Sequence, residues 1–68
     1  MKNTSSKILY QYICDNFQIE DQSRNIIRNI IEFVLSQENW GISFKSYALT
    51  KMLTSIKISE AEILRCIT

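Results

Sequence analysis

The feature that most constrains this chain is an isoleucine-rich stretch, RNIIRNIIEFVLS at residues 24–36, whose apolar side chains recur at helical spacing. At about 100° per residue, the apolar side chains fill an arc of roughly 160°. A row of charged side chains spaced four apart, which we expect to be solvated, occupies the other side. The sequence therefore predicts an amphipathic helix over about residues 20–37. The charged row consists of Glu20, Arg24, Arg28 and Glu32.

Nothing in the remaining sequence interrupts helices, because the chain has no proline and only one glycine, Gly41. Apolar spacing predicts further helices over about residues 5–17 and 43–56, and a short C-terminal helix over 59–67. No linker or internal repeat divides the chain. We therefore expect a single all-α domain, residues 1–68, built from three helices and the short terminal one.

Several side chains indicate where helices begin and end. Hydroxyl groups that can accept a hydrogen bond from a first helical turn are those of Thr4, Ser5, Ser6, Ser43, Ser46 and Ser59. Ser59 is followed three residues later by Glu62, which is the pattern of a capping box. Asn39 or Gly41 is expected to take the left-handed conformation that ends the second helix. Trp40 is expected to cover the edge of the core.

The size of the chain favours pairing with a second copy. A single core of 68 residues is only marginally stable, and the chain has no histidine and no cysteine pattern typical of a zinc site or disulfide framework. On the first helix only Lys7, Gln11 and Asp15 form a polar stripe, so partners are needed on several sides. We therefore predict a helical homodimer. The predicted interface residues are Ile8, Tyr12, Ile26, Ile27, Ile30, Ile31, Phe33 and Val34.

Composition argues against several classes of protein. Histidine, the commonest proton-transfer residue near neutral pH, is absent, and neither Cys14 nor Cys66 has an evident activating base, so we expect no enzyme and no cofactor or metal. No uncharged apolar run approaches the roughly 20 residues that span a bilayer, so no membrane partner is expected. Both thiols suit a reducing, cytoplasmic location.

A DNA-binding helix-turn-helix in the C-terminal half is the alternative reading. The helix starting at Ser59 would read the groove. Against this reading, the turn is long, Glu60 and Glu62 repel phosphate, and the net charge of the chain is only +1. The residues that would contact nucleic acid are Lys45, Lys51, Lys57 and Arg65.

The order of these elements resembles the small enterobacterial YmgB/AriR family, which includes the YcgZ type. The likeness covers roughly residues 7–57. Similar residues on the second helix and turn are Ser23, Ile26, Ile30, Val34, Leu35, Ser36 and Asn39, and on the third helix Lys45, Leu49, Met52, Leu53 and Ile56. The chain departs from the family at Gln37 and Glu38, where the family tends to have glycine, and at Ile56 and Lys57, where it has Leu-Glu.

The resemblance implies an all-helical homodimer without enzymatic activity. Such a protein would be a connector or regulator that touches two-component signalling, with a sensor kinase or response regulator as its partner, and thereby biofilm formation and acid resistance in a stress response. DNA binding has been proposed within that family. A phage- or plasmid-encoded inhibitor of a host protein is a further alternative, since such proteins are also small, helical and free of catalytic groups.

Overall fold

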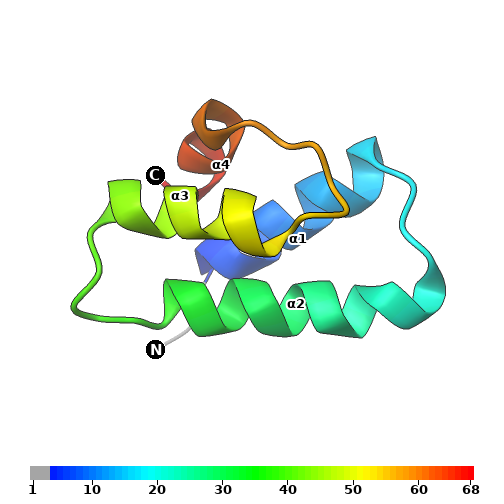
Figure 1. Cartoon of the computed structure of the whole chain (residues 1–68), viewed down its shortest axis with the longest axis horizontal. Helices are drawn as coiled ribbons and strands as arrows, with labels where there is room; N and C mark the ends of the chain where they lie inside the picture. Colours follow the sequence, from blue (N-terminus) through cyan, green and yellow to red (C-terminus); the bar gives the residue numbers. More distant parts are fainter. Residues whose placement is uncertain (1–3) are drawn as a thin grey trace.

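The computed structural model describes residues 4–68, and over this range the chain is all-helical. The four helices are α1 (Thr4–Asn16), α2 (Asp21–Leu35), α3 (Ile42–Met52) and α4 (Glu60–Ile67), joined without any strand in the described part (Figure 1). The predicted all-α class is confirmed. Residues 1–3 of the predicted domain lie outside the described residues.

The four helices close into a ring in which each packs against two neighbours. α1 contacts α2, α2 contacts α3, α3 contacts α4, and α4 returns to α1. The two ends of the described chain meet where the Ser5 hydroxyl donates to the Ile67 carbonyl oxygen at 3.5 Å. The short C-terminal helix is therefore an integral wall of the core between α1 and α3, as Figure 1 shows.

A single aliphatic core fills the middle of this ring. Its buried apolar members come from every helix and from the α3–α4 connection: Leu9, Ile13, Ile27, Ile31, Val34, Leu49, Leu53, Ile56, Ile58, Ile63 and Ile67. Burial of each such side chain contributes about 1.5–3 kcal/mol of transfer free energy. No helix within residues 4–68 is long and apolar enough to cross a membrane.

The charged row of α2 lies beside α1, although its side chains remain exposed to solvent. The Arg24 Nη1 atom lies 3.8 Å from the sulfur of Cys14, and the Arg28 guanidinium carbon lies 4.8 Å from the centre of the Tyr10 ring. Long cationic side chains commonly cover apolar surface with their stems. The predicted solvated face therefore also shields one side of α1, whose apolar residues occupy most of its circumference.

The C-terminus of α2 is satisfied without any left-handed residue, so the predicted cap at Asn39 or Gly41 is wrong. No described residue has a positive φ. The Ser36 N–H donates to the Glu32 carbonyl at 3.1 Å and the Gln37 N–H to the Val34 carbonyl at 3.2 Å. The remaining two carbonyls of the last turn also have partners: Ser36 Oγ and Gln37 Nε2 donate to Phe33, and Lys45 Nζ donates to Leu35. Side-chain donors thus replace the glycine-type cap.

α3 begins at Ile42 with Gly41 at the N-cap position and no side-chain cap. The predicted capping roles of Ser43 and Ser46 are therefore wrong. Ser46 is fully buried, and its hydroxyl donates back to the Ile42 carbonyl at 3.1 Å. Its donor is satisfied inside the helix, as is common for a buried serine.

α3 also ends earlier than predicted, at Met52 instead of near residue 56. Leu53 leaves the helical conformation with φ −92° and ψ 61°. Beyond it, Ile56 and Ile58 are buried on either side of the exposed Lys57. Alternation of this kind belongs to extended backbone. The core therefore takes these two isoleucines from a connecting segment, which also brings α4 back onto α1 and α3.

One predicted helix start is confirmed, that of the last helix. In α1 the first described residue, Thr4, is already helical, so the residue before the helix lies outside the described residues. α4 has Ser59 as its N-cap, and its Oγ accepts a hydrogen bond from the Glu62 N–H at 3.2 Å. The Glu62 carboxylate has turned toward Arg65 instead of the Ser59 N–H, with Arg65 Nη2 at 3.9 Å. The capping box therefore has the hydrogen bond to the Ser59 hydroxyl, whereas the Glu62 carboxylate contacts a neighbouring side chain instead of the Ser59 N–H.

Candidate functional site

The outward side of α3 carries large apolar side chains that nothing in the described chain covers. Its inward side chains Ser46, Leu49 and Leu53 are buried at spacings of three and four residues. Phe44, Tyr47 and Lys51 repeat the same spacing about 160° away on the helix. A helix with apolar residues on both sides is normally covered on both sides. On α3 the second side is open.

Four aromatic side chains form a continuous chain of ring contacts across the end of α2, the α2–α3 loop and α3. Phe33 and Trp40 meet edge to face with ring centres 6.3 Å apart, and Trp40 and Phe44 do so at 5.0 Å. Phe44 and Tyr47 follow at 6.5 Å with tilted rings. Edge-to-face pairs of this kind each add about 0.5–1.5 kcal/mol beyond the area that they bury. We call Phe33, Trp40, Phe44 and Tyr47 the aromatic surface.

Three members of the aromatic surface remain half exposed. Phe33 is 53% exposed, Phe44 50% and Tyr47 49%, and Ile26 on the same side of α2 as Phe33 is 60% exposed. With about 200 Å² for each full aromatic side chain, the three rings present roughly 300 Å² of area to solvent. Contiguous patches of about 300–600 Å² are the largest on a typical monomer and are often functional. The aromatic surface is therefore the strongest candidate site in the described chain.

Trp40 is the most enclosed member of the aromatic surface. It is half-buried and packs against the aliphatic core, which confirms its predicted position at the core edge. Its ring also touches Phe33 and Phe44. Trp40 therefore joins the rigid core to the exposed rings, so the aromatic surface is held by the fold.

A cation lies at one end of the aromatic surface. Lys51 Nζ lies 5.4 Å from the centre of the Tyr47 ring. A cation over an aromatic face is attracted by the ring quadrupole by about 0.5–1 kcal/mol at an exposed site. Any group bound here thus meets apolar rings bordered by a positive charge.

The predicted interface residues fall into three groups. The chain itself covers Ile27, Ile31 and Val34, which are at most 4% exposed, so these three form no open surface. This corrects the prediction: α2 packs against both α1 and α3, which cover these three side chains within one chain. Tyr12 and Ile30 are half-buried, and the exposed residues are Ile8, Ile26 and Phe33.

The core takes only half of the apolar arc on α2. Ile27, Ile31 and Val34 lie in the half next to the charged row, whereas Ile26 and Phe33 lie in the other half. That second half continues into the aromatic surface through the Phe33–Trp40 contact. Only this half of the arc is open to a partner.

The four predicted nucleic-acid residues do not gather into one cationic patch. Lys45 Nζ donates to the Leu35 carbonyl at 3.1 Å, and Lys51 lies over Tyr47, about 120° from Lys45 on the α3 helix. Arg65 pairs with Glu62, and Lys57 is exposed on the α3–α4 connection. Lys45 thus works as a cap for α2, where a positive charge also suits the helix dipole.

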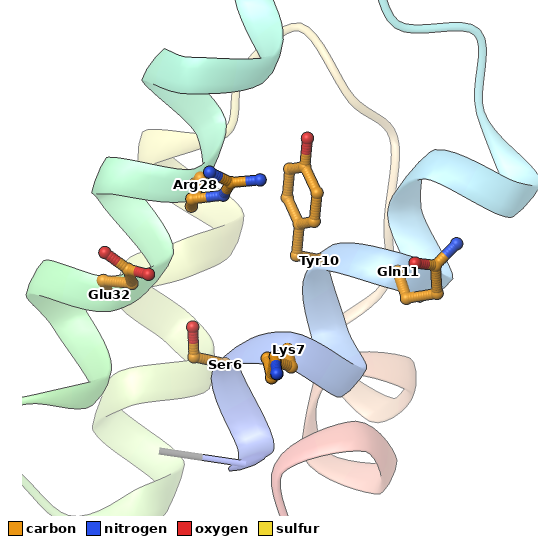
Figure 2. A pocket seen from close by; sticks show the side chains of 6 residues that line it. All are labelled: Ser6, Lys7, Tyr10, Gln11, Arg28 and Glu32. Carbon is orange, nitrogen blue, oxygen red and sulfur yellow. The ribbon is translucent and has the colours of Figure 1, made fainter. Parts of the chain in front are cut away.

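A groove with a volume of about 440 Å³ lies between α1 and α2, apart from the aromatic surface. Figure 2 shows the Arg28 guanidinium beside the Tyr10 ring, with Lys7 and Glu32 near it. Ser6 and Gln11 complete the lining. Because this groove mixes both signs of charge and Arg28 is engaged with Tyr10, it favours no single class of ligand.

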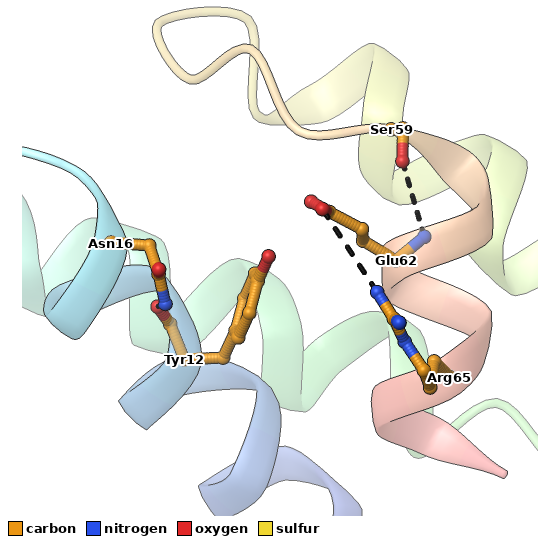
Figure 3. A network of polar contacts seen from close by, with 5 residues as sticks. All are labelled: Tyr12, Asn16, Ser59, Glu62 and Arg65. Carbon is orange, nitrogen blue, oxygen red and sulfur yellow. Dashed lines mark hydrogen bonds and ion pairs between the residues drawn. The ribbon is translucent and has the colours of Figure 1, made fainter.

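Polar side chains also join α1 to α4. The Tyr12 hydroxyl points toward the Glu62 carboxylate, beside the Glu62–Arg65 ion pair (Figure 3). Hydrogen bonding to this carboxylate, together with desolvation, raises the pKa of Tyr12 above its usual value. Burial likewise raises the pKa of the Cys66 thiol. A raised thiol pKa disfavours the nucleophilic thiolate, which makes Cys66 a poor nucleophile.

Within residues 4–68 no group of three or more His, Cys, Asp or Glu side chains is arranged to hold a metal ion. Both cysteines are free thiols.

Phe44 and Tyr47 lie within the helix predicted over residues 43–56, but they were not among the predicted site residues. The signal was present in their spacing. They lie on the opposite side of the helix from Leu49 and Leu53, so a core that contains the leucines leaves the aromatic residues outside.

Comparison with known proteins finds no relative: no family model, no curated protein and no solved structure matches the chain.

Proposed function

We propose that this chain is a small, non-enzymatic regulatory protein that acts by contact with another protein through the aromatic surface. The observation that carries the proposal is the exposure of Phe33, Phe44 and Tyr47, each about half exposed on a rigid core. Aromatic residues held in place lose little conformational entropy on binding and dominate the energetics of protein interfaces. The likeness to the YmgB/AriR family supports the same reading, as does the absence of histidine from the chain.

By that resemblance, the regulated process is two-component signalling in the cytoplasm, with biofilm formation and acid resistance as its outputs. The partner would be a sensor kinase or a response regulator. The exposed apolar side of α2 and α3 is the surface that such a partner would contact.

Pairing with a second copy remains part of the proposal, now with a smaller set of residues. Ile8, Ile26 and Phe33 are the exposed members of the predicted interface, and Tyr12 and Ile30 border them. Sedimentation equilibrium tests the pairing: a dimer in the micromolar range supports it, and a monomer over the whole range contradicts it. Ile26→Asp is the informative variant, because Ile26 is 60% exposed and its replacement leaves the core intact.

The protein-contact function is tested by comparing two exposed sites on one scaffold. The double variant Phe44→Ser/Tyr47→Ser removes two exposed members of the aromatic surface, and Met52→Ser removes a comparably exposed apolar residue of α3 outside it. The immobilised chain and both variants are used to capture proteins from a lysate of the source organism. A partner bound by the wild type and by Met52→Ser but lost from the double variant supports the proposal.

Circular dichroism of both variants is the necessary control, because all three residues are half exposed and their replacement should preserve helicity. If the captured proteins are the same for the double variant and the wild type, the aromatic surface is not the contact site and the proposal fails.

A further inference from the structure

Positive charge is concentrated in the part of the chain that contains α3. Residues 39–59 carry three lysines and no acidic residue, which leaves five basic and seven acidic residues elsewhere. These lysines do not share one face, because Lys45 and Lys51 lie about 120° apart on α3 and Lys57 lies on the α3–α4 connection. The carboxylates nearest to the aromatic surface in sequence are those of Glu32, beside Phe33, and Glu38, in the α2–α3 loop.

Lys51 is the cation best placed to act on a bound partner. It lies on the outward side of α3, in line with Phe44 and Tyr47, and is exposed. Its Nζ atom rests 5.4 Å from the Tyr47 ring centre without any ion-pair partner among the ion pairs of the described chain. Lys45, in contrast, is committed to the carbonyl of Leu35. One cation therefore borders the aromatic surface with its charge available.

We propose that the aromatic surface binds an acidic amphipathic segment of a partner protein, whose apolar side chains cover Phe33, Phe44 and Tyr47 and whose carboxylate pairs with Lys51. This inference rests on the proposed function and specifies the chemistry of the partner. Apolar residues on one side of the segment would cover the exposed parts of Phe33, Phe44 and Tyr47, which amount to roughly 300 Å². An acidic residue at the edge complements Lys51, the cation beside these rings.

A second copy of the chain fits the same surface less well, because Lys51 is the cation at its Tyr47 end, and two such ends facing each other would bring like charges together. Pairing of two copies would therefore use Ile8 and Ile26 and leave Phe33 to the partner segment. Single-stranded nucleic acid also stacks on aromatic rings, but it needs a groove of several cations along the backbone. Here Lys45 is engaged and α4 begins with Glu60 and Glu62, which repel phosphate.

The test identifies the preferred ligand by selection from a peptide library. A library of random peptides displayed on phage is selected on the immobilised full chain, and the selected sequences are made as free peptides. We expect them to combine apolar residues at helical or alternating spacing with a net negative charge. Trp40 is the only tryptophan, so its fluorescence reports binding at the aromatic surface directly.

Two charge reversals separate local from general electrostatics. Lys51→Glu is expected to weaken binding of the selected peptides about three- to thirtyfold, since a surface attraction becomes a repulsion. Lys57→Glu changes the net charge equally, but from the α3–α4 connection, and is expected to weaken binding less than about twofold. Phe44→Ala, at a half-exposed site, should abolish the Trp40 response and leave helicity unchanged.

The other outcomes overturn the inference in distinguishable ways. Selected peptides that are basic or neutral, yet still depend on Phe44, would overturn the acidic partner and leave the protein-contact function standing. Peptides that bind independently of Phe44, or no selected peptide at all, would overturn both. An oligothymidine that quenches Trp40 in place of acidic peptides would assign the surface to nucleic acid, and a dimer abolished by Phe44→Ala would assign it to a second copy.

Discussion

The clearest test of the fold compares two isoleucines of α2 that the sequence alone treats as equivalent. Ile31 is fully buried, whereas Ile26 is 60% exposed. Replacement of either by alanine removes about three methylene equivalents at ~0.8 kcal/mol each. For Ile31 the full transfer term applies and a cavity is added, so we expect a loss of roughly 3–4 kcal/mol in the free energy of unfolding.

For Ile26 only about two fifths of the transfer term applies, which is about 1 kcal/mol, and the surroundings leave no closed cavity. Alanine also has a helix propensity better than that of isoleucine by about 0.4 kcal/mol. The expected net loss is therefore about 0.5 kcal/mol. A domain of this size has a total stability of only about 3–10 kcal/mol, so Ile31→Ala is expected to fold marginally and Ile26→Ala almost normally.

The assay is urea unfolding followed by far-ultraviolet circular dichroism. Because Ile31→Ala is expected to fold only marginally, the pair Ile31→Val and Ile26→Val gives a second comparison, with expected losses of about 1 kcal/mol and about 0.3 kcal/mol. Equal losses at the two positions would refute the assignment of Ile31 to the core and Ile26 to the surface. A loss at Ile26 that shrinks on roughly twentyfold dilution would show instead that a second copy covers it.

Three further predictions concern the capping residue, the tyrosine that faces α4 and the half-buried thiol. Ser59→Ala removes the acceptor of the Glu62 N–H and is expected to lower the free energy of unfolding by about 1 kcal/mol. The control Ser55→Ala, at an exposed position in the preceding connection, should cost much less, and equal urea midpoints for the two variants would contradict the cap. The hydrogen bond to Glu62 raises the pKa of Tyr12, so the protonated phenol stabilises the fold below about pH 10, and this contribution is lost as the pH rises through the folded-state pKa. Tyr12→Phe should therefore lose less stability than the wild type between neutral and alkaline pH, and parallel urea-midpoint profiles of the two proteins would contradict this. Burial raises the pKa of the Cys66 thiol and so lowers the fraction of reactive thiolate in the folded chain. In a Cys14→Ser background, iodoacetamide should therefore alkylate the folded chain more slowly than the urea-unfolded chain at the same pH, and equal rates would show that the thiol is open to solvent.

Helix identity was predictable because the local signals agree. The chain lacks proline, its single glycine lies in a loop, and the apolar residues of the second helix repeat at helical spacing. The start of α4 was also local, since Ser59 and Glu62 lie within one turn of each other. Helix ends were less predictable, because the last turn of α2 is completed by Lys45, ten residues from the carbonyl that it caps.

The candidate site was likewise predictable only in part. The sequence by itself determined that α2 has a wide apolar arc and that α3 has apolar residues on both sides, since both follow from residue spacing. Which part of each apolar set is covered depends on where the other helices pack, and periodicity contains no such information. Only the tertiary structure decided that Ile31 belongs to the core and that Phe44 faces solvent, because α2 packs against α1 and α3, and α3 packs against α2 and α4.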